Sequence, residues 1–209
     1  MPNSVNDSLS KSLRDIKLGD HLCLIYETQE EQFEVVIPFI KYGLEKNEKC
    51  IYVADDNTVE QVMGAMSSVD SELFTEAIKK GSLLILTKKD SYLKDGYFDP
   101  EKMIALLKQI EQEAIRDGYS GLRVTGEMTW MLAAEPGSDR LMEYEAELNN
   151  FIPGSKACGI CQYNAKRFSN EILLDVFSTH PFVIIRGRLV ANPLYSTPEE
   201  FLLRRKSLR

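Results

Sequence analysis

The sequence predicts a three-layer α/β fold, in which a mostly parallel sheet is covered by helices on both faces. Short apolar runs alternate with helical patterns along most of the chain, an order that is typical of βαβ units. With 209 residues and 44% hydrophobic composition, the chain can bury one sizeable core. Because no internal repeat and no linker divides the sequence, we expect a single domain.

The sequence contains clear signals for strands and for the starts of helices. We expect six strands, at residues 22–26, 50–54, 82–87, 122–126, 157–163 and 182–185. Thr28 and Glu31 have the spacing of a capping box and therefore begin the first long helix. Two shorter helices, at residues 59–66 and 71–80, precede the third strand. Asp99, followed by a proline that suits the first helical position, begins a further long helix.

The C-terminal part predicts two more helices, then a hairpin and a final helix. The two helices lie at residues 139–150 and 168–178, and the hairpin turns at Arg186 and Gly187. The motif TPEE caps the final helix. Residues 1–17 are expected to be a frayed or accessory N-terminal extension, and residues 18–209 to form the single domain.

Composition and charge exclude several classes of protein. The net charge of −7 argues against direct nucleic-acid binding, which needs a basic surface. No apolar segment of a signal peptide is present at the N-terminus, and no run approaches the roughly 20 apolar residues of a membrane span. Four scattered cysteines are typical of free thiols in a reducing compartment. We therefore expect a soluble cytoplasmic protein.

The turn after the first strand, ETQEE, argues against the binding and hydrolysis of a nucleotide at this site. In many chains of this layout a glycine-rich loop holds phosphate there, because consecutive backbone N–H groups face the oxygens and a lysine neutralises the charge. Here the turn holds no glycine, and Glu27, Glu30 and Glu31 would repel a triphosphate. We expect the frame to be kept without phosphate chemistry, and no cofactor.

A candidate ligand site lies at the carboxyl ends of the strands, where open parallel sheets bind their ligands. Alternation along LRVTGEMTW places Arg123, Thr125 and Glu127 on one face of a strand. Buried charges need partners. Two interpretations stay open, a structural polar network and a site in which Arg123 anchors an anionic or carbonyl ligand and Glu127 accepts from it. Trp130 is either the wall of an apolar pocket or ordinary core.

The histidines and cysteines suggest weaker alternatives. His21 and Cys23 share one strand face and could reach one metal ion, although no metal is our main expectation. Cys158 and Cys161 have C-x-x-C spacing, but on a strand they point to opposite faces. Buried thiols are the default, and redox sensing through Cys161 or Cys23 is the alternative. His180 is either a helix-end cation or a ligand contact, and no hydrolase triad is supported.

Two segments carry less chemistry in the sequence. The loop KKDSYLKDGYFDP is rich in aromatic residues and is either a lid or a loop held by its own side chains. The helix segment EYEAELNN is interpreted as a solvated acidic face.

Four motifs in order, GDHLCLIYET, LRVTGEMTW, CGICQYN and THP…NPLYSTPEEFL, resemble the MEDS family of methanogen and methylotroph sensory domains. Residues 19–56 also resemble RecA-like ATPases of the circadian-clock KaiC type. The resemblance implies a RecA-like frame that senses a small hydrocarbon-derived molecule. The residues expected to bind it are Tyr26, Glu27, Arg123, Glu127, Trp130, Tyr163 and His180.

The main hypothesis is a non-catalytic sensory domain in signal transduction or transcriptional regulation. Family members usually carry a DNA-binding or signalling module, and none follows the last motif, so we expect output through a separate regulatory protein. A self-associating scaffold, such as a homodimer, is the first alternative. A residual nucleotide-binding protein is the second.

Overall fold

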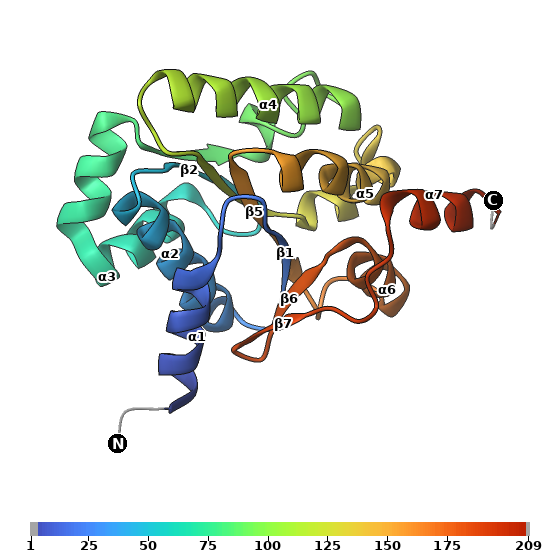
Figure 1. Cartoon of the computed structure of the whole chain (residues 1–209), viewed down its shortest axis with the longest axis horizontal. Coiled ribbons are helices and arrows are strands. Elements are labelled where there is room, and N and C mark those ends of the chain that lie inside the picture. The colour runs from blue at the N-terminus through green and yellow to red at the C-terminus, as the bar shows by residue number, and fades with distance from the viewer. Residues whose placement is uncertain (1–3, 208–209) are drawn as a thin grey trace.

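A seven-stranded sheet forms the centre of the structure, a computed structural model that describes residues 4–207 (Figure 1). Its strands run in the order β3-β2-β4-β5-β1-β6-β7, and only the edge strand β7 is antiparallel to its neighbour. Their bounds are β1 His21–Tyr26, β2 Lys49–Ala54, β3 Leu83–Thr87, β4 Leu122–Glu127, β5 Ala157–Asn164, β6 Phe182–Ile185 and β7 Arg188–Ala191.

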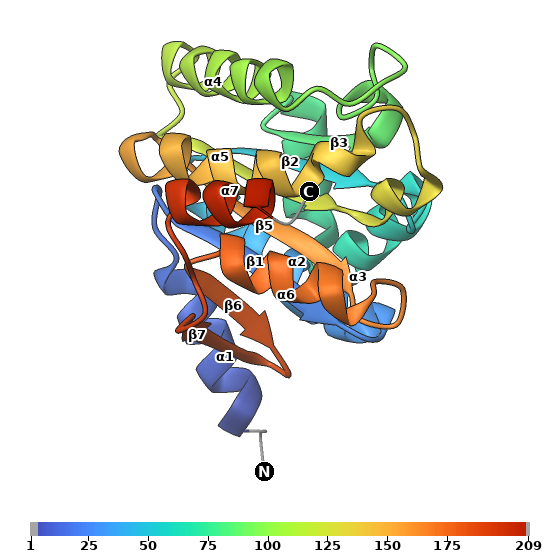
Figure 2. The same cartoon turned by 90° about the vertical axis from the view of Figure 1, so that its right-hand side faces the viewer.

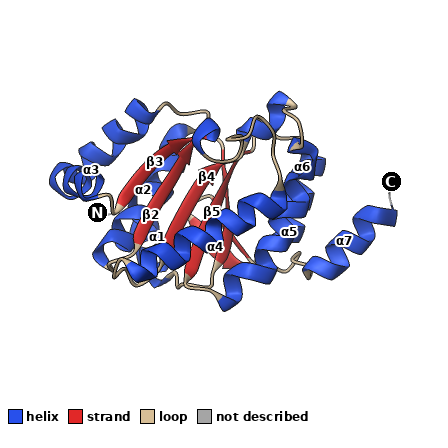
Figure 3. Cartoon of the chain, turned by 90° about the horizontal axis from the view of Figure 1, so that it is seen from above, coloured by secondary structure: helices blue, strands red, loops and turns tan. Residues whose placement is uncertain are grey.

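Helices cover both faces of this sheet, as the sequence predicted. One layer holds α1 (Ser4–Asp15), α2 (Gln29–Glu45) and α3 (Val59–Lys80). The other holds α4 (Pro100–Arg116), α5 (Leu141–Phe151), α6 (Asn170–Thr179) and α7 (Pro198–Ser207), and Figure 3 looks onto the sheet through α4 and α5. Among residues 4–207, no helix combines the length and the apolar character that a membrane span requires.

Successive strand residues alternate between two buried apolar layers. In β1, Leu22 and Leu24 pack with α1, α2 and α3, whereas Cys23 and Ile25 pack with the opposite helices. This alternation follows from the two-residue repeat of a strand. Because both layers are apolar, the strands are buried on both faces, which is why the strand positions were readable as apolar runs.

Most predicted boundaries agree with the structure, and one pair of helices is joined. The predicted helices at residues 59–66 and 71–80 form the single element α3, which is interrupted at Asp70 by an extended backbone. The C-terminal hairpin is confirmed, since β6 pairs with β7 and both turn residues, Arg186 and Gly187, have positive φ angles. Two consecutive positive φ angles define the two-residue turn that matches strand twist.

The N-terminal extension is not frayed over the residues that the structure describes. It forms α1, which packs against α2 and against the hairpin strand β7 (Figure 2). Leu9, Leu13 and Ile16 are buried, and the hydroxyls of Ser10 and Tyr42 lie 2.6 Å apart. The expectation of a frayed segment is therefore wrong for this helix. Residues 1–3 of the predicted extension lie outside the described residues.

The polar face of β4 points toward α2 and begins with a buried cation. Arg123 is fully buried, donates from Nε to Glu48 and lies with its guanidinium 4.5 Å from the ring centroid of Phe39. Gly43 of α2 faces it closely, because a Cβ there would stand 2.4 Å from Arg123 Cδ. Within residues 4–207, the two terminal guanidinium nitrogens have no hydrogen-bond partner. Glu48 therefore provides the ion pair that compensates the buried charge.

At the other end of this face, Glu127 accepts hydrogen bonds from three residues. Its oxygens receive the Tyr52 hydroxyl at 2.7 Å, the Asp55 amide at 2.9 Å, and both the amide and the side chain of Asn57 at 3.0 and 2.7 Å. Protein groups thus supply partners for Glu127 and for Nε of Arg123, as the polar-network interpretation predicts for these atoms.

Shortening Leu13 tests whether α1 belongs to the cooperative fold. We expect Leu13→Ala to lower the free energy of unfolding by about 2–5 kcal/mol, because it leaves a cavity at a fully buried position. Urea unfolding measures the change, and Leu203→Ala on α7, where the side chain is 68% exposed, is the matched control. Equal stabilities of the two variants would show that α1 unfolds separately.

Removing the partner of Arg123 tests the polar face. We expect Glu48→Ala to destabilise the fold by about 3–5 kcal/mol, because a buried guanidinium then lacks an anion. Glu45→Ala removes a surface partner of Arg14 and should cost at most about 1 kcal/mol. Chemical unfolding of both variants gives the comparison. A loss below 1 kcal/mol for Glu48→Ala would contradict the assignment.

Candidate functional site

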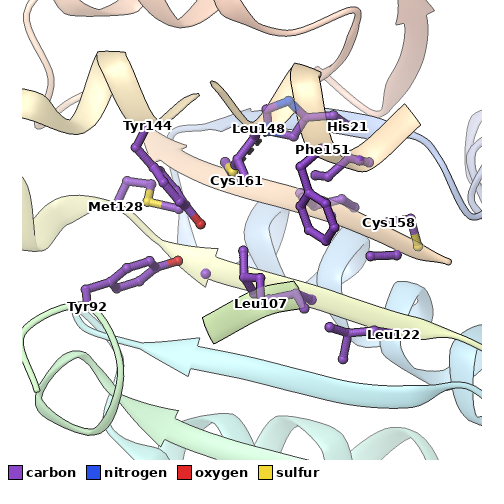
Figure 4. Close-up of a pocket in the computed structure, with 16 residues that line it drawn as sticks. His21, Tyr92, Leu107, Leu122, Met128, Tyr144, Leu148, Phe151, Cys158 and Cys161 are labelled. Atoms are coloured by element: carbon purple, nitrogen blue, oxygen red, sulfur yellow. Dashed lines mark hydrogen bonds between the residues drawn. The ribbon is translucent and has the colours of Figure 1, made fainter. Parts of the chain in front are cut away.

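A buried cavity lies between the sheet and the layer of α4 and α5 (Figure 4). It leaves about 30 Å³ of space for the centres of water-sized groups. Strands β4 and β5 form its floor, and its apolar lining includes Leu107, Leu122, Val124, Leu148, Phe151 and Ile152. An apolar cavity with a small number of polar groups is the usual form of a small-molecule site.

Two tyrosine hydroxyls face this cavity. Tyr92 and Tyr144 approach from opposite sides, and their hydroxyls point toward the middle of the space (Figure 4). Gly126 makes room for one of them, because a Cβ on this strand residue would stand 2.2 Å from the Tyr92 hydroxyl oxygen. Neither hydroxyl has a hydrogen-bond partner within residues 4–207. Both are therefore available to a ligand.

One end of the cavity meets a buried cluster of His21, Glu145, Cys161 and His180. The Nε2 atoms of His21 and His180 lie 3.4 and 3.3 Å from Glu145 Oε2, and the Cys161 sulfur lies 3.3 Å from the same oxygen. The sulfur is also 3.6 Å from His21 Nε2. One potential ligand atom from each residue lies within 4.8 Å of the other three. All four side chains thus converge on one point.

Hydrogen bonds fix the orientation of both imidazoles. Nδ1 of His21 contacts Asn149 Oδ1 at 3.0 Å, and Nδ1 of His180 contacts the Val176 carbonyl at 2.8 Å. The Asn149 amide nitrogen donates to backbone carbonyls, including that of Thr179 at 2.7 Å, so its oxygen faces His21. Each Nδ1 therefore donates its proton outward, and each Nε2 points into the cluster.

Burial and mutual charge set the protonation of the cluster. Burial would raise the pKa of Glu145, but the two imidazoles beside it outweigh burial and hold the pKa below its usual value. Burial and the neighbouring His180 lower the pKa of His21. Burial and the Glu145 charge raise the pKa of the Cys161 thiol well above its usual value. The cluster therefore contains an ionised carboxylate and a protonated thiol.

Three residues that the sequence singled out, two histidines and one tyrosine, lie in this cluster or bind to it. His180 and His21 are members, and Tyr163, predicted as a ligand contact, donates its hydroxyl to Glu145 Oε1. Cys23, the alternative metal ligand with His21, is not a member, and its sulfur lies 3.9 Å from the Phe182 carbonyl. Cys161, which pairs in register with Cys23 on the neighbouring strand, supplies the thiol instead.

The other predicted site residues lie elsewhere. Arg123 and Glu127 belong to the opposite face of β4, and Tyr26 packs in the opposite core layer. Glu27 is exposed and lies 3.9 Å from Lys166, and Trp130 packs with its ring centroid 5.1 Å from that of Tyr92. None of these five residues lines the apolar cavity, and their role as ligand contacts stays a prediction.

Sequence reasoning missed Glu145, because EYEAELNN was interpreted as a solvated acidic face. The structure corrects this, since Glu145 is fully buried. A signal was present: Glu145 lies four residues after Leu141 and three before Leu148, on the apolar stripe of the helix. Within the aromatic loop, the rings of Tyr92 and Phe98 meet edge to face with centroids 6.3 Å apart, as expected for a loop held by its own side chains.

Comparison with solved structures supports the fold alone. A KaiC-like protein from Pyrococcus horikoshii aligns with a TM-score of 0.54 at 15% identity, over 79% of this chain and 70% of its own. The flagellar accessory protein FlaH from Methanocaldococcus jannaschii aligns with a TM-score of 0.54 at 17% identity, over 88% of this chain and 81% of its own. The predicted RecA-like frame is confirmed.

Comparison with known sequences identifies the domain. The transcriptional repressor DcmR of Methylorubrum extorquens is 26% identical over 186 residues, which cover 86% of this chain and 65% of the repressor. Residues 20–181 match the sequence profile of MEDS, the MEthanogen/methylotroph, DcmR Sensory domain. Because that match includes strands β1 to β5 and most of the length of the chain, the chain belongs to the MEDS family.

Proposed function

We propose that this sensory domain binds a small organic molecule in the cavity between the sheet and α5 and passes the binding on to a regulatory output. Membership of a sensory family and similarity to a transcriptional repressor support a regulatory role. The observation that carries the proposal is the cavity itself, which is buried and mostly apolar and is faced by two hydroxyls that have no hydrogen-bond partner within residues 4–207.

The size of the cavity restricts the ligand class. A single water needs about 10–15 Å³ of space for its centre, and the cavity offers about 30 Å³. A ligand of two or three non-hydrogen atoms fits this space. Apolar walls favour its carbon atoms, while the hydroxyls of Tyr92 and Tyr144 suit one polar atom. Short alcohols, methylamines and methyl sulfides have this composition.

Helix α5 offers a route from ligand to output. It supplies Tyr144, Leu148 and Phe151 to the cavity wall, and it packs against α4, α6 and α7. A ligand that fills the space adds contacts to α5, which favours the helix position that makes those contacts. A change in α5 reaches the outer surface through α6 and α7, where a signalling or regulatory protein could detect it.

We propose further that the domain is not a nucleotide-dependent enzyme. In the turn after β1, the amide of Glu27 donates to Glu31 Oε2 at 2.8 Å, and the amide of Glu31 donates to Thr28 Oγ1 at 3.3 Å. These N–H groups are therefore already bonded by the turn's own side chains. The acidic side chains add repulsion toward phosphate.

The variant Gly159→Ala tests the cavity proposal. Gly159 lines the cavity, and an added Cβ would meet the Val124 carbonyl oxygen at 3.5 Å and Ile152 Cδ1 at 4.0 Å, which are ordinary contacts. The variant should fold and lose most of the free space. We expect ethanol, methylamine or dimethyl sulfide to raise the melting temperature of the unaltered protein and not that of Gly159→Ala. A ligand at 100 times its dissociation constant adds about 2.7 kcal/mol to stability.

Gly64→Ala is the matched control, since a Cβ at this position on α3 meets no atom within 4 Å. It should keep the ligand-induced shift. Hexanol tests the size limit and should give no shift at an equal concentration. A shift that survives in Gly159→Ala would place the ligand elsewhere, and a shift only with ATP and magnesium would overturn the proposal in favour of a nucleotide-binding protein.

A further inference from the structure

We propose that His21, Glu145, Cys161 and His180 bind one divalent transition-metal ion of the zinc type. The four residues come from β1, α5, β5 and the end of α6, and one donor atom of each lies within 4.8 Å of the others. This inference does not depend on the organic ligand, because it rests on the donor atoms of the cluster and not on the cavity.

The spacing of the donor atoms is that of a tetrahedral metal site. A zinc ion with bonds of about 2.0–2.1 Å to nitrogen and oxygen and about 2.3 Å to sulfur separates its ligand atoms by roughly 3.3–3.6 Å. Four of the six separations among these atoms are 3.3, 3.3, 3.4 and 3.6 Å, and all six lie within 4.8 Å. Direct hydrogen bonds between nitrogen and oxygen are shorter, with a mode of about 2.9–3.0 Å. The distances from Glu145 Oε2 to the other three donor atoms, and the distance from Cys161 Sγ to His21 Nε2, thus match the separations that a shared ion imposes.

The orientation of the imidazoles directs electron-rich atoms toward the centre of the cluster, where a positive charge would stabilise them. Both Nδ1 atoms face acceptors, so in neutral rings both Nε2 atoms carry lone pairs. These lone pairs converge on Oε2 of Glu145. Nε2 of His180 is 3.3 Å from that carboxylate but outside hydrogen-bonding geometry, and it is fully buried without a hydrogen-bond partner within residues 4–207. A cation between these atoms satisfies all three groups.

Protonation of both histidines would compensate the charge of the cluster less well than a bound metal ion does. Two imidazolium rings would repel each other, because the ring centroids of His21 and His180 are 4.3 Å apart. With a divalent ion bound, Cys161 releases its proton to solvent and becomes a thiolate. The charges of thiolate, Glu145 carboxylate and ion then sum to zero. A neutral centre avoids the large cost of an uncompensated charge in the interior.

The surrounding residues have the form of a metal-supporting shell. Histidine ligands almost always donate their other ring N–H to a carbonyl or carboxylate, as His21 does to Asn149 and His180 does to Val176. Glu145 is held by the Tyr163 hydroxyl. Two nitrogens, one oxygen and one sulfur favour zinc and its first-row neighbours, whereas magnesium and calcium prefer oxygen ligands.

Cobalt(II) provides the direct test, because it takes the place of zinc and its tetrahedral thiolate complexes absorb visibly. Tag-free, chelator-treated protein is titrated with cobalt under reducing conditions. We expect saturation at one ion per chain, with d–d bands of a tetrahedral ion and a thiolate-to-cobalt charge-transfer band. Zinc should abolish both signals at one equivalent, and magnesium should leave them unchanged.

Matched thiol variants assign the site. Cys161→Ala should lose the charge-transfer band, while Cys23→Ala should keep the full spectrum. Cys23 is also a buried thiol and pairs with Cys161 in register, but it is not a member of the cluster, so it is the matched control. His180→Gln, which removes a different donor, should weaken cobalt binding at least tenfold and keep the charge-transfer band at saturation. Circular dichroism checks that each variant is folded.

The titration also has a pH dependence of known sign. Protons compete with the metal for the imidazoles and the thiol, so cobalt affinity should fall as the pH is lowered. The absence of a thiolate band in the unaltered protein with excess cobalt would overturn the proposal, whatever the variants do. Loss of the band in Cys23→Ala but not in Cys161→Ala would overturn the assignment of its ligands.

Discussion

The burial of one carboxylate, that of Glu145, determines much of the organisation around β5. An ionised group inside an apolar layer is stable only when other groups compensate its charge. The compensating groups come from separate parts of the chain: His21 begins β1, Tyr163 is the penultimate residue of β5, and His180 follows α6. The requirement of a single side chain therefore fixes the position of α5 relative to the sheet and to the end of α6.

The sheet separates two polar systems, the hydrogen-bond network of Glu127 and the cluster around Glu145. On the α2 side, Glu127 receives four hydrogen bonds from Tyr52, Asp55 and Asn57, and this system has the character of permanent structure. On the α5 side, the cluster retains an unpaired imidazole nitrogen and borders free space. Because the two systems lie on opposite faces of the sheet, a change at the Glu145 cluster can occur while the Glu127 network holds the sheet together.

The fold was predictable from the sequence, whereas the site was predictable only in part. Apolar runs and capping residues locate buried strands and helix starts, since these signals are local. Histidines within matching motifs led to His21 and His180. Arg123 and Glu127 drew attention as polar residues on a buried strand, but their partners come from distant segments. The cavity is a property of how side chains fill space, which depends on Leu107, Phe151 and many others together, and no local pattern encodes it.

The close approach of α2 to β4 has an evolutionary consequence. Gly43 and Arg123 occupy the same small volume, because any Cβ at position 43 would overlap the arginine side chain, whose backbone lies in another element. Whether a substitution is tolerated at one of these positions therefore depends on the residue at the other. Across the relatives of this domain, the two positions should covary: a larger residue at position 43 should accompany a shorter one at position 123, and the anion at position 48 should then be free to change.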